Sequence, residues 1–200
     1  MRYAISIGLL LLALATTGNA QFETDVSGVG TSAGTFLEIG VGARAQAMGG
    51  AYAALSNDPS GLYYNPAGIV WVKNAQLEVM HNEWLVGTRY DFVGLLLPLP
   101  FLNSTLGTNL IMLDYGEQPV RTVERPEGTG ELWDARDYTV GLTWALALTD
   151  RFSFGLTGKY VSQKIWHETG SAMAIDLGIH YNTMLKGLKL GLAMCNFGNE

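Results

Sequence analysis

The chain has 200 residues, 48% of them hydrophobic, a formal net charge of −6 and one cysteine, Cys195. The acidic balance argues against a nucleic-acid partner, because a nucleic-acid-binding surface needs basic residues to replace phosphate counterions. One cysteine gives neither a disulfide framework nor a thiolate metal cluster. The three histidines are scattered without metal-binding spacing, so we expect no metal and no cofactor.

Residues 1–20 are predicted to be a cleavable export signal. Arg2 supplies a positive start, residues 4–15 form an apolar run, and Gly18-Asn19-Ala20 places small residues where a signal peptidase cleaves. The alternative is a retained anchor, but twelve apolar residues are too few to cross a bilayer as a helix. Cleavage before Gln21 leaves 11 basic and 18 acidic residues, a net charge of −7.

Residues 21–72 are predicted to form a compact element rich in glycine and alanine, with short helical turns over 43–48, 59–64 and 66–70. Asp58 precedes Pro59 and Asn65 precedes Pro66, so each is expected to cap a turn that begins with proline. Residues 40–45 also fit the Gly-x-Gly-x-x-Gly/Ala template of a dinucleotide-binding turn. Gly49-Gly50 would break the helix that this template requires, and no βαβ unit surrounds it.

From residue 75 onward the apolar positions recur every second residue, which predicts β-strands with one apolar face. Tyr138, Val140, Leu142 and Trp144 alternate with small or weakly polar residues, for example. The uncharged stretch 92–113 is long enough for a membrane helix, but prolines at its centre indicate a hairpin instead. The expected strands are 75–84, 88–97, 107–115, 137–148, 152–165, 171–183 and 188–196.

Two classes of antiparallel sheet fit this alternation, a transmembrane barrel and a soluble sandwich. The strands are long enough to cross a bilayer at a tilt, and the face opposite the apolar one is small and polar, as in a barrel lumen. Aromatic residues near strand ends fit interfacial girdles. These are Trp84, Tyr90, Tyr115, Trp166 and Tyr181. The pattern therefore favours the barrel, over residues 73–200.

The connections also fit an outer-membrane barrel. Short connections at 98–106, 149–151 and 184–187 would face the periplasm, and the long charged connection at 116–136 would face outward. Seven is an odd number of strands, whereas single-chain bacterial barrels close with an even number. We therefore expect the N-terminal portion of a longer protein; a complete barrel of eight strands is the alternative.

Residues 36–70, FLEIGVGARAQAMGGAYAALSNDPSGLYYNPAGIV, resemble the N-terminal signature of the PorV/PorQ family, which is related to the FadL-type outer-membrane barrels. The matching features are the run at 40–45, Met48-Gly49-Gly50-Ala51, the turn at 57–60 and Tyr64-Asn65-Pro66-Ala67-Gly68. The strand end at 191–198 is similar to a later strand of that family. The connection at 116–136 adds nothing to the resemblance.

The resemblance implies an all-β, up-and-down barrel of about 14 strands in the bacterial outer membrane, with residues 21–72 as a hatch. PorV-like members serve type IX secretion, where their partners are exported cargo proteins and secretion subunits. FadL-like members pass hydrophobic small molecules such as fatty acids, and this is the alternative function. Neither type is an enzyme, and both contact outer-membrane lipid.

Two groups of candidate site residues follow, one in the hatch and one on the inward face of the strands. Asn65, Pro66, Ala67 and Gly68 form a hinge or a ligand contact in the hatch, and Gly40, Gly42, Arg44, Gly49 and Gly50 surround its only cation. Lys159, Asp176, His180 and Lys189 face inward, as a lumen network or a polar gate. Arg44 is expected to pair either with an inward acid such as Asp176 or locally with Asp58. No nucleophile and base lie close enough for catalysis.

Overall fold

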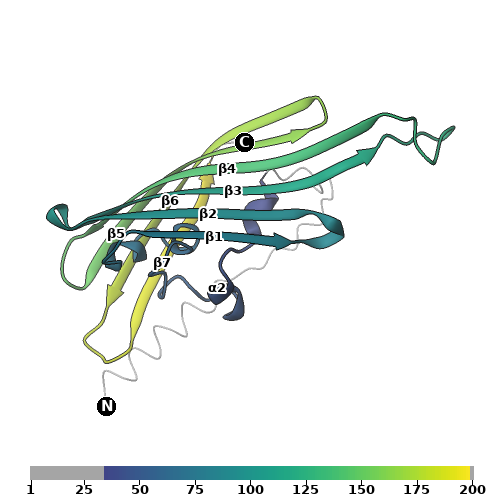
Figure 1. Ribbon diagram of the computed structural model, residues 1–200. Coiled ribbons are helices and arrows are strands. Elements are labelled where there is room, and N and C mark those ends of the chain that lie inside the picture. Colours follow the sequence, from purple (N-terminus) through teal and green to yellow (C-terminus); the bar gives the residue numbers. More distant parts are fainter. Residues whose placement is uncertain (1–33, 199–200) are drawn as a thin grey trace, which may run out of the picture. The chain divides into compact units, whose positions relative to one another are not determined.

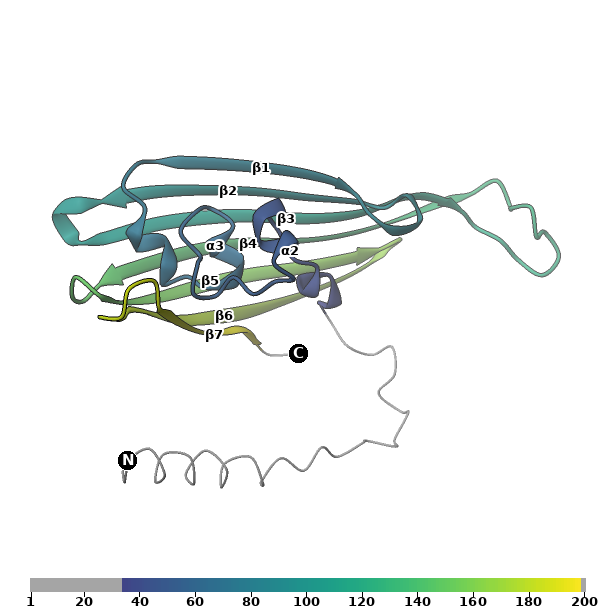
Figure 2. The ribbon, with the colours of Figure 1, turned by 90° about the horizontal axis from the view of Figure 1, so that it is seen from below.

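The computed structural model describes residues 34–198, which form one curved antiparallel sheet with a short helical segment along it (Figures 1 and 2). The seven strands pair in sequence order, each with the next. They are β1 (Gln76–Glu83), β2 (Arg89–Leu99), β3 (Ser104–Pro119), β4 (Leu132–Ala147), β5 (Phe152–Ile165), β6 (Glu168–Asn182) and β7 (Lys189–Gly198).

All seven predicted strands are confirmed, and β3 and β4 exceed their expected lengths most, with 16 residues each against 9 and 12 expected. β3 and β4 continue to pair as far as Pro119 and Leu132, because a bulge between Asp114 and Glu117 lets the ladder resume. Gly116 supplies the positive φ, +70°, inside this bulge. The connection predicted at 116–136 therefore shrinks to 120–131. The sheet is open: within residues 34–198, β1 and β7 each pair on one side only.

The segment before β1 consists of four short helices that lie within the curve of the sheet (Figure 2). They are η2 (Thr35–Glu38), α2 (Ala43–Ala47), α3 (Gly61–Tyr64) and η3 (Gly68–Trp71). The predicted turns are present at these positions, but α3 and η3 begin two residues after the prolines. Two further short turns, η4 (Leu85–Gly87) and η5 (Pro100–Leu102), connect β1 to β2 and β2 to β3. Among the described residues, no helix has the length and hydropathy to cross a membrane.

The two faces of the sheet differ in an unusual way. One face is covered by the N-terminal segment. On β4 and β5 this covered face carries mainly small and polar residues such as Thr139, Thr143 and Thr157, which are buried, whereas on β2 and β3 it carries larger apolar residues. The opposite face carries large apolar side chains and nothing in residues 34–198 covers it: Val79 and Leu142 are each 68% exposed. A water-soluble sheet normally buries its apolar face, so this arrangement is inverted.

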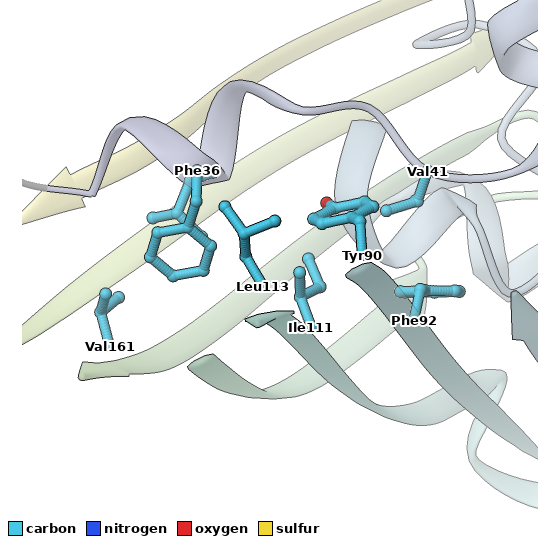
Figure 3. Close-up of a cluster of buried hydrophobic side chains, with 8 residues drawn as sticks. Phe36, Val41, Tyr90, Phe92, Ile111, Leu113 and Val161 are labelled. Atoms are coloured by element: carbon cyan, nitrogen blue, oxygen red, sulfur yellow. The ribbon is translucent and has the colours of Figure 1, made fainter. Parts of the chain in front are cut away.

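The largest hydrophobic cluster forms where the first described residues meet β2 and β3 (Figure 3). Phe36, Leu37 and Val41 pack there against residues of the sheet. The sheet residues are Tyr90, Phe92, Ile111, Leu113 and Val161. A second cluster joins Leu62 and Ile69 to the sheet. Both clusters fix the N-terminal segment to the covered face.

Two predicted girdle residues belong to this covered face instead. Tyr90 is fully buried and donates a hydrogen bond to the carbonyl oxygen of Ile39, at 2.6 Å. Tyr115 is half-buried and donates to Asp137, at 3.0 Å. Both side chains share the face of Phe92 and Leu113, so their assignment to an outward girdle was wrong. Trp84, Trp166 and Tyr181 remain exposed.

Candidate functional site

Asn65 is the centre of the contact between residues 34–72, called the hatch below, and the sheet. Its side chain is fully buried, and its amide nitrogen donates to the carbonyl oxygens of Ala53, at 2.8 Å, and Ile179, at 3.0 Å. Its amide oxygen accepts a hydrogen bond from the backbone of Ala67, at 3.0 Å, which is the capping contact that the sequence predicts. One side chain thus joins two parts of the hatch to β6. Ser153 on β5 completes the contact by donating to the carbonyl oxygen of Ala67, at 2.8 Å.

Glycines on the sheet make room for this contact. A Cβ on Gly155 would collide with the backbone of Pro66 and Ala67, and one on Gly178 would collide with Asn65 and meet Cδ of Pro66 at 2.9 Å. Gly155 and Gly178 are register partners on β5 and β6, so together they form one opening for residues 65–67. Gly191 on β7 does the same for the backbone of Ala53. These strands approach the hatch more closely than any side chain permits.

His180 makes a second connection from β6 to the hatch. The indole nitrogen of Trp71 donates to Nδ1 of His180, at 3.1 Å, and Nε2 lies 3.0 Å from the carbonyl oxygen of Ala54. Because an indole nitrogen only donates, Nδ1 must accept and Nε2 must carry the proton. His180 is therefore a neutral imidazole that bridges Ala54, in the middle of the hatch, and Trp71, at its end. It takes no part in the Lys159–Asp176 pair.

Lys159 and Asp176 form an ion pair between β5 and β6, at 2.6 Å, with side chains only 2% and 0% exposed. Asn196 on β7 bonds to both, since its side-chain oxygen accepts from Lys159, at 2.8 Å, and its backbone nitrogen donates to Asp176, at 2.7 Å. These contacts sit at the register shift between β6 and β7, where Asn196 has a positive φ of 58°. Lys189, the fourth predicted inward residue, is exposed at the start of β7, and within residues 34–198 it forms no ion pair.

Arg44 pairs with Asp58, at 3.5 Å, the local alternative of the two partners considered from sequence. Its guanidinium also donates to the hydroxyl of Tyr52, at 2.9 Å, and lies over that ring. Asp58 does not cap a helix. Its carboxylate instead accepts hydrogen bonds from Tyr52 and from Ser60, the latter at 2.5 Å. Burial and the neighbouring Asp58 carboxylate raise the pKa of Tyr52 above its ordinary value.

The hatch glycines have two distinct environments. Gly40 and Gly42 lie where a Cβ would press on Tyr64, at 2.7 Å, and on Ser60, also at 2.7 Å. Gly49 and Gly50 have positive φ of 63° and 78° but open space around them. The first pair therefore permits packing inside the hatch, and the second pair ends α2.

The described residues contain no group of three or more His, Cys, Asp or Glu side chains placed to hold a metal ion. His81 forms a hydrogen-bonded pair with Asp91, at 2.6 Å, on the outward face rather than beside a nucleophile. The thiol of Cys195 lies 3.8 Å from the carbonyl oxygen of Tyr63, in the hatch contact. Of these groups, only Cys195 touches the hatch.

Cavities lie at the two ends of the covered face. One of about 460 Å³ is mainly apolar and includes Phe36, Ile39, Trp84, Leu113 and Trp133 in its lining. The other, about 530 Å³, lies beside Trp71, Lys73, Pro98 and the turn at 149–150. Both volumes fall in the range of small-molecule sites.

Sequence reasoning missed Trp71, Ser153 and Asn196 as contact residues. Ser153 and Gly155 belong to the small face that the alternation reveals, but alternation does not show what covers that face. Trp71 gives no signal, because its partner His180 is more than 100 residues away. Asn196 is visible only as the residue before Phe197-Gly198.

The model of an uncharacterised protein family, UPF0164, matches residues 13–97, a range that includes the hatch motif, β1 and β2 as far as Leu97. No curated protein and no solved structure matches the chain.

Proposed function

We propose that this sheet is the wall of an outer-membrane β-barrel and that the protein serves in protein export. The hatch, residues 34–72, would be a plug on the inner side of this wall. One observation carries the membrane assignment, namely that large apolar side chains such as Val79 and Leu142 stand uncovered on one face of the sheet, while residues 34–72 cover the opposite face. Lipid would cover the first face, and the plug already covers the second. The barrel would close around the plug with about 14 strands, as the PorV/PorQ resemblance implies.

The height of the apolar band supports this assignment. On β4 and the residue after it, outward apolar or aromatic side chains continue from Tyr138 to Leu148. Ten steps of about 3.3 Å give about 33 Å along the strand. At a tilt of about 40°, this corresponds to a band about 25 Å tall, the height typical of an outer-membrane barrel.

The rigid attachment of the plug supports the export function over transport. Asn65, Ser153 and His180 bind the plug to β5 and β6 through hydrogen bonds, and Gly155 and Gly178 bring the backbones together. A plug held this way suits a protein that presents a fixed surface to protein partners. The PorV/PorQ resemblance over residues 36–70 points the same way, to an accessory component of type IX secretion that binds exported proteins.

Transport of a hydrophobic small molecule, as in FadL-like proteins, is the second candidate. The apolar cavity of about 460 Å³ favours it, since Phe36, Ile39 and Leu113 give the cavity a lining suited to an acyl chain. In that case the plug would have to move at residues 34–50, away from the Asn65 contact. We propose a catalytic role for neither candidate.

Replacement of Leu142 tests the membrane assignment. On a lipid-facing strand, Leu142→Arg should lower the free energy of unfolding by about 2–4 kcal/mol. In a water-exposed sheet the same change should stay within about 0.5 kcal/mol. Val123→Arg is the matched control, because Val123 is 97% exposed in the connection at 120–131. Urea unfolding of the full-length protein in lipid vesicles measures both, and equal small effects would refute the assignment.

Partners retained by the protein test the export function. The full-length protein would be purified from outer membranes in mild detergent, and mass spectrometry would identify what accompanies it. Secreted proteins that share a C-terminal domain, or a large translocon subunit, would support export. Fatty acid or lipid alone, without a protein partner, would support the transporter instead.

A further inference from the structure

A row of charged side chains crosses the outward face of the sheet at a single height. Glu83, Arg89, Asp114, Arg136 and Lys164 are successive register partners on β1 to β5. Register partners share a face, so all five side chains belong to the same face as the apolar band. We call these five residues the charged row.

Two neighbours in the charged row carry the same charge. Arg136 on β4 lies directly opposite Lys164 on β5. Like charges opposite each other on adjacent strands destabilise a sheet unless an anion lies between them. Both side chains are about half exposed, so such an anion can reach them from outside the sheet.

The protein's own carboxylates pair poorly with these two cations. Arg136 reaches Oδ2 of Asp114 only at 3.5 Å, and Arg89 already donates to that same oxygen at 2.8 Å. Nζ of Lys164 lies 3.3 Å from Oδ2 of Asp134. Asp134 lies two residues before Arg136 on β4, farther from the apolar band than the charged row. Well-formed charge-assisted hydrogen bonds are about 2.7–2.9 Å long. Both cations therefore retain donors for another acceptor.

The position of the charged row indicates which anion would supply that acceptor. Tyr138 lies two residues below Arg136 on the same face, and its ring is 6.4 Å from that of Tyr160. Below these tyrosines the face is apolar, with Val140, Leu142 and Leu156 exposed. This order matches a bilayer, in which apolar side chains face the acyl chains, tyrosines lie at the interface and cations lie at the headgroups.

We propose that Arg136 and Lys164 bind the phosphate of an anionic lipid headgroup, with Tyr138 and Tyr160 against the start of its acyl chains. This inference rests on the proposed membrane location. The guanidinium of Arg136 offers a planar pair of donors that matches a phosphate, and Lys164 adds a point charge. Asp134 opposes binding through its contact with Lys164.

Lipid titration of the full-length protein tests the site. The protein in neutral detergent would be titrated with phosphatidic acid, with phosphatidylcholine of the same chain length, and with inorganic phosphate, while its thermal unfolding is followed. Wild type should prefer phosphatidic acid. Arg136→Gln and Lys164→Gln should each weaken its binding about tenfold, as loss of one charge-assisted contact does. Asp134→Asn should strengthen it about threefold.

Arg121→Gln is the control, because Arg121 lies in the connection at 120–131, outside the charged row, and should bind like wild type. Equal binding of phosphatidic acid by wild type and Arg136→Gln would overturn the proposal. Equal stabilisation by inorganic phosphate would also overturn it, since the ligand would then be a free anion. If Leu142→Arg destabilises the protein while the row variants bind normally, only this inference fails; if Leu142→Arg has no effect, the membrane location fails first.

Discussion

Replacement of Asn65 by alanine should detach the hatch segment from the sheet. Asn65 is fully buried and makes three hydrogen bonds, to Ala53, Ile179 and Ala67. The alanine variant keeps the backbone turn before Pro66 but removes all three contacts. It also leaves the backbone nitrogen of Ala67 without this partner inside a buried contact.

The expected loss follows from these three bonds. A hydrogen bond contributes about 1 kcal/mol net, and a buried group left without a partner costs about 1–3 kcal/mol. Three lost bonds therefore destabilise the docked hatch by about 3 kcal/mol. Since about 1.4 kcal/mol corresponds to a factor of ten, the population of undocked hatch should rise roughly 100-fold.

A cysteine placed beneath the hatch offers an assay for this change. Because Cys195 is exposed, it is first replaced by serine, and Ser153, which is fully buried against Ala67, is replaced by cysteine. Undocking exposes this thiol, so a maleimide should label it faster in Asn65→Ala than in the same protein with Asn65. Asn57→Ala is the matched control, because Asn57 is exposed and accepts only one hydrogen bond, from Arg44. If both variants are labelled at the rate of the parent protein, Asn65 does not hold the hatch.

Two further predictions concern the contacts beneath the hatch. Gly178→Ala should destabilise the protein by about 1–3 kcal/mol in urea unfolding, because its Cβ would collide with Asn65. Gly158→Ala, on β5 with nothing within 4 Å, should be near neutral, and a similar loss in both would contradict the close approach. Asp176→Asn should cost about 3–5 kcal/mol by leaving the Lys159 ammonium buried without its partner. The double change Lys159→Met with Asp176→Leu should recover most of this loss in the same assay; no recovery would mean that the ion pair itself is required.

The sequence alone predicted the strands and their faces. Alternation such as Tyr138, Val140, Leu142 and Trp144 depends only on the two-residue period of a strand, so it indicates which side chains share a face without knowledge of their partners. Pro98 and Pro100 likewise exclude one long helix and place the turn between β2 and β3. The capping contact from Asn65 to Ala67 is equally local, because it spans two residues.

Only the tertiary structure decided which distant residues meet. Inward alternation groups Lys159, Asp176, His180 and Lys189, but the structure joins only the first two as an ion pair and places His180 beside Trp71 of η3. The role of Gly155 and Gly178 is likewise invisible in sequence, since it depends on residues 65–67 lying across two register partners. Tyr90 shows the same limit, because its position near a strand end predicted an outward girdle while packing against Phe36 and Val41 holds it inside. A local pattern fixes the direction of a side chain relative to its neighbours, whereas the partner it reaches depends on how strands far apart in sequence align.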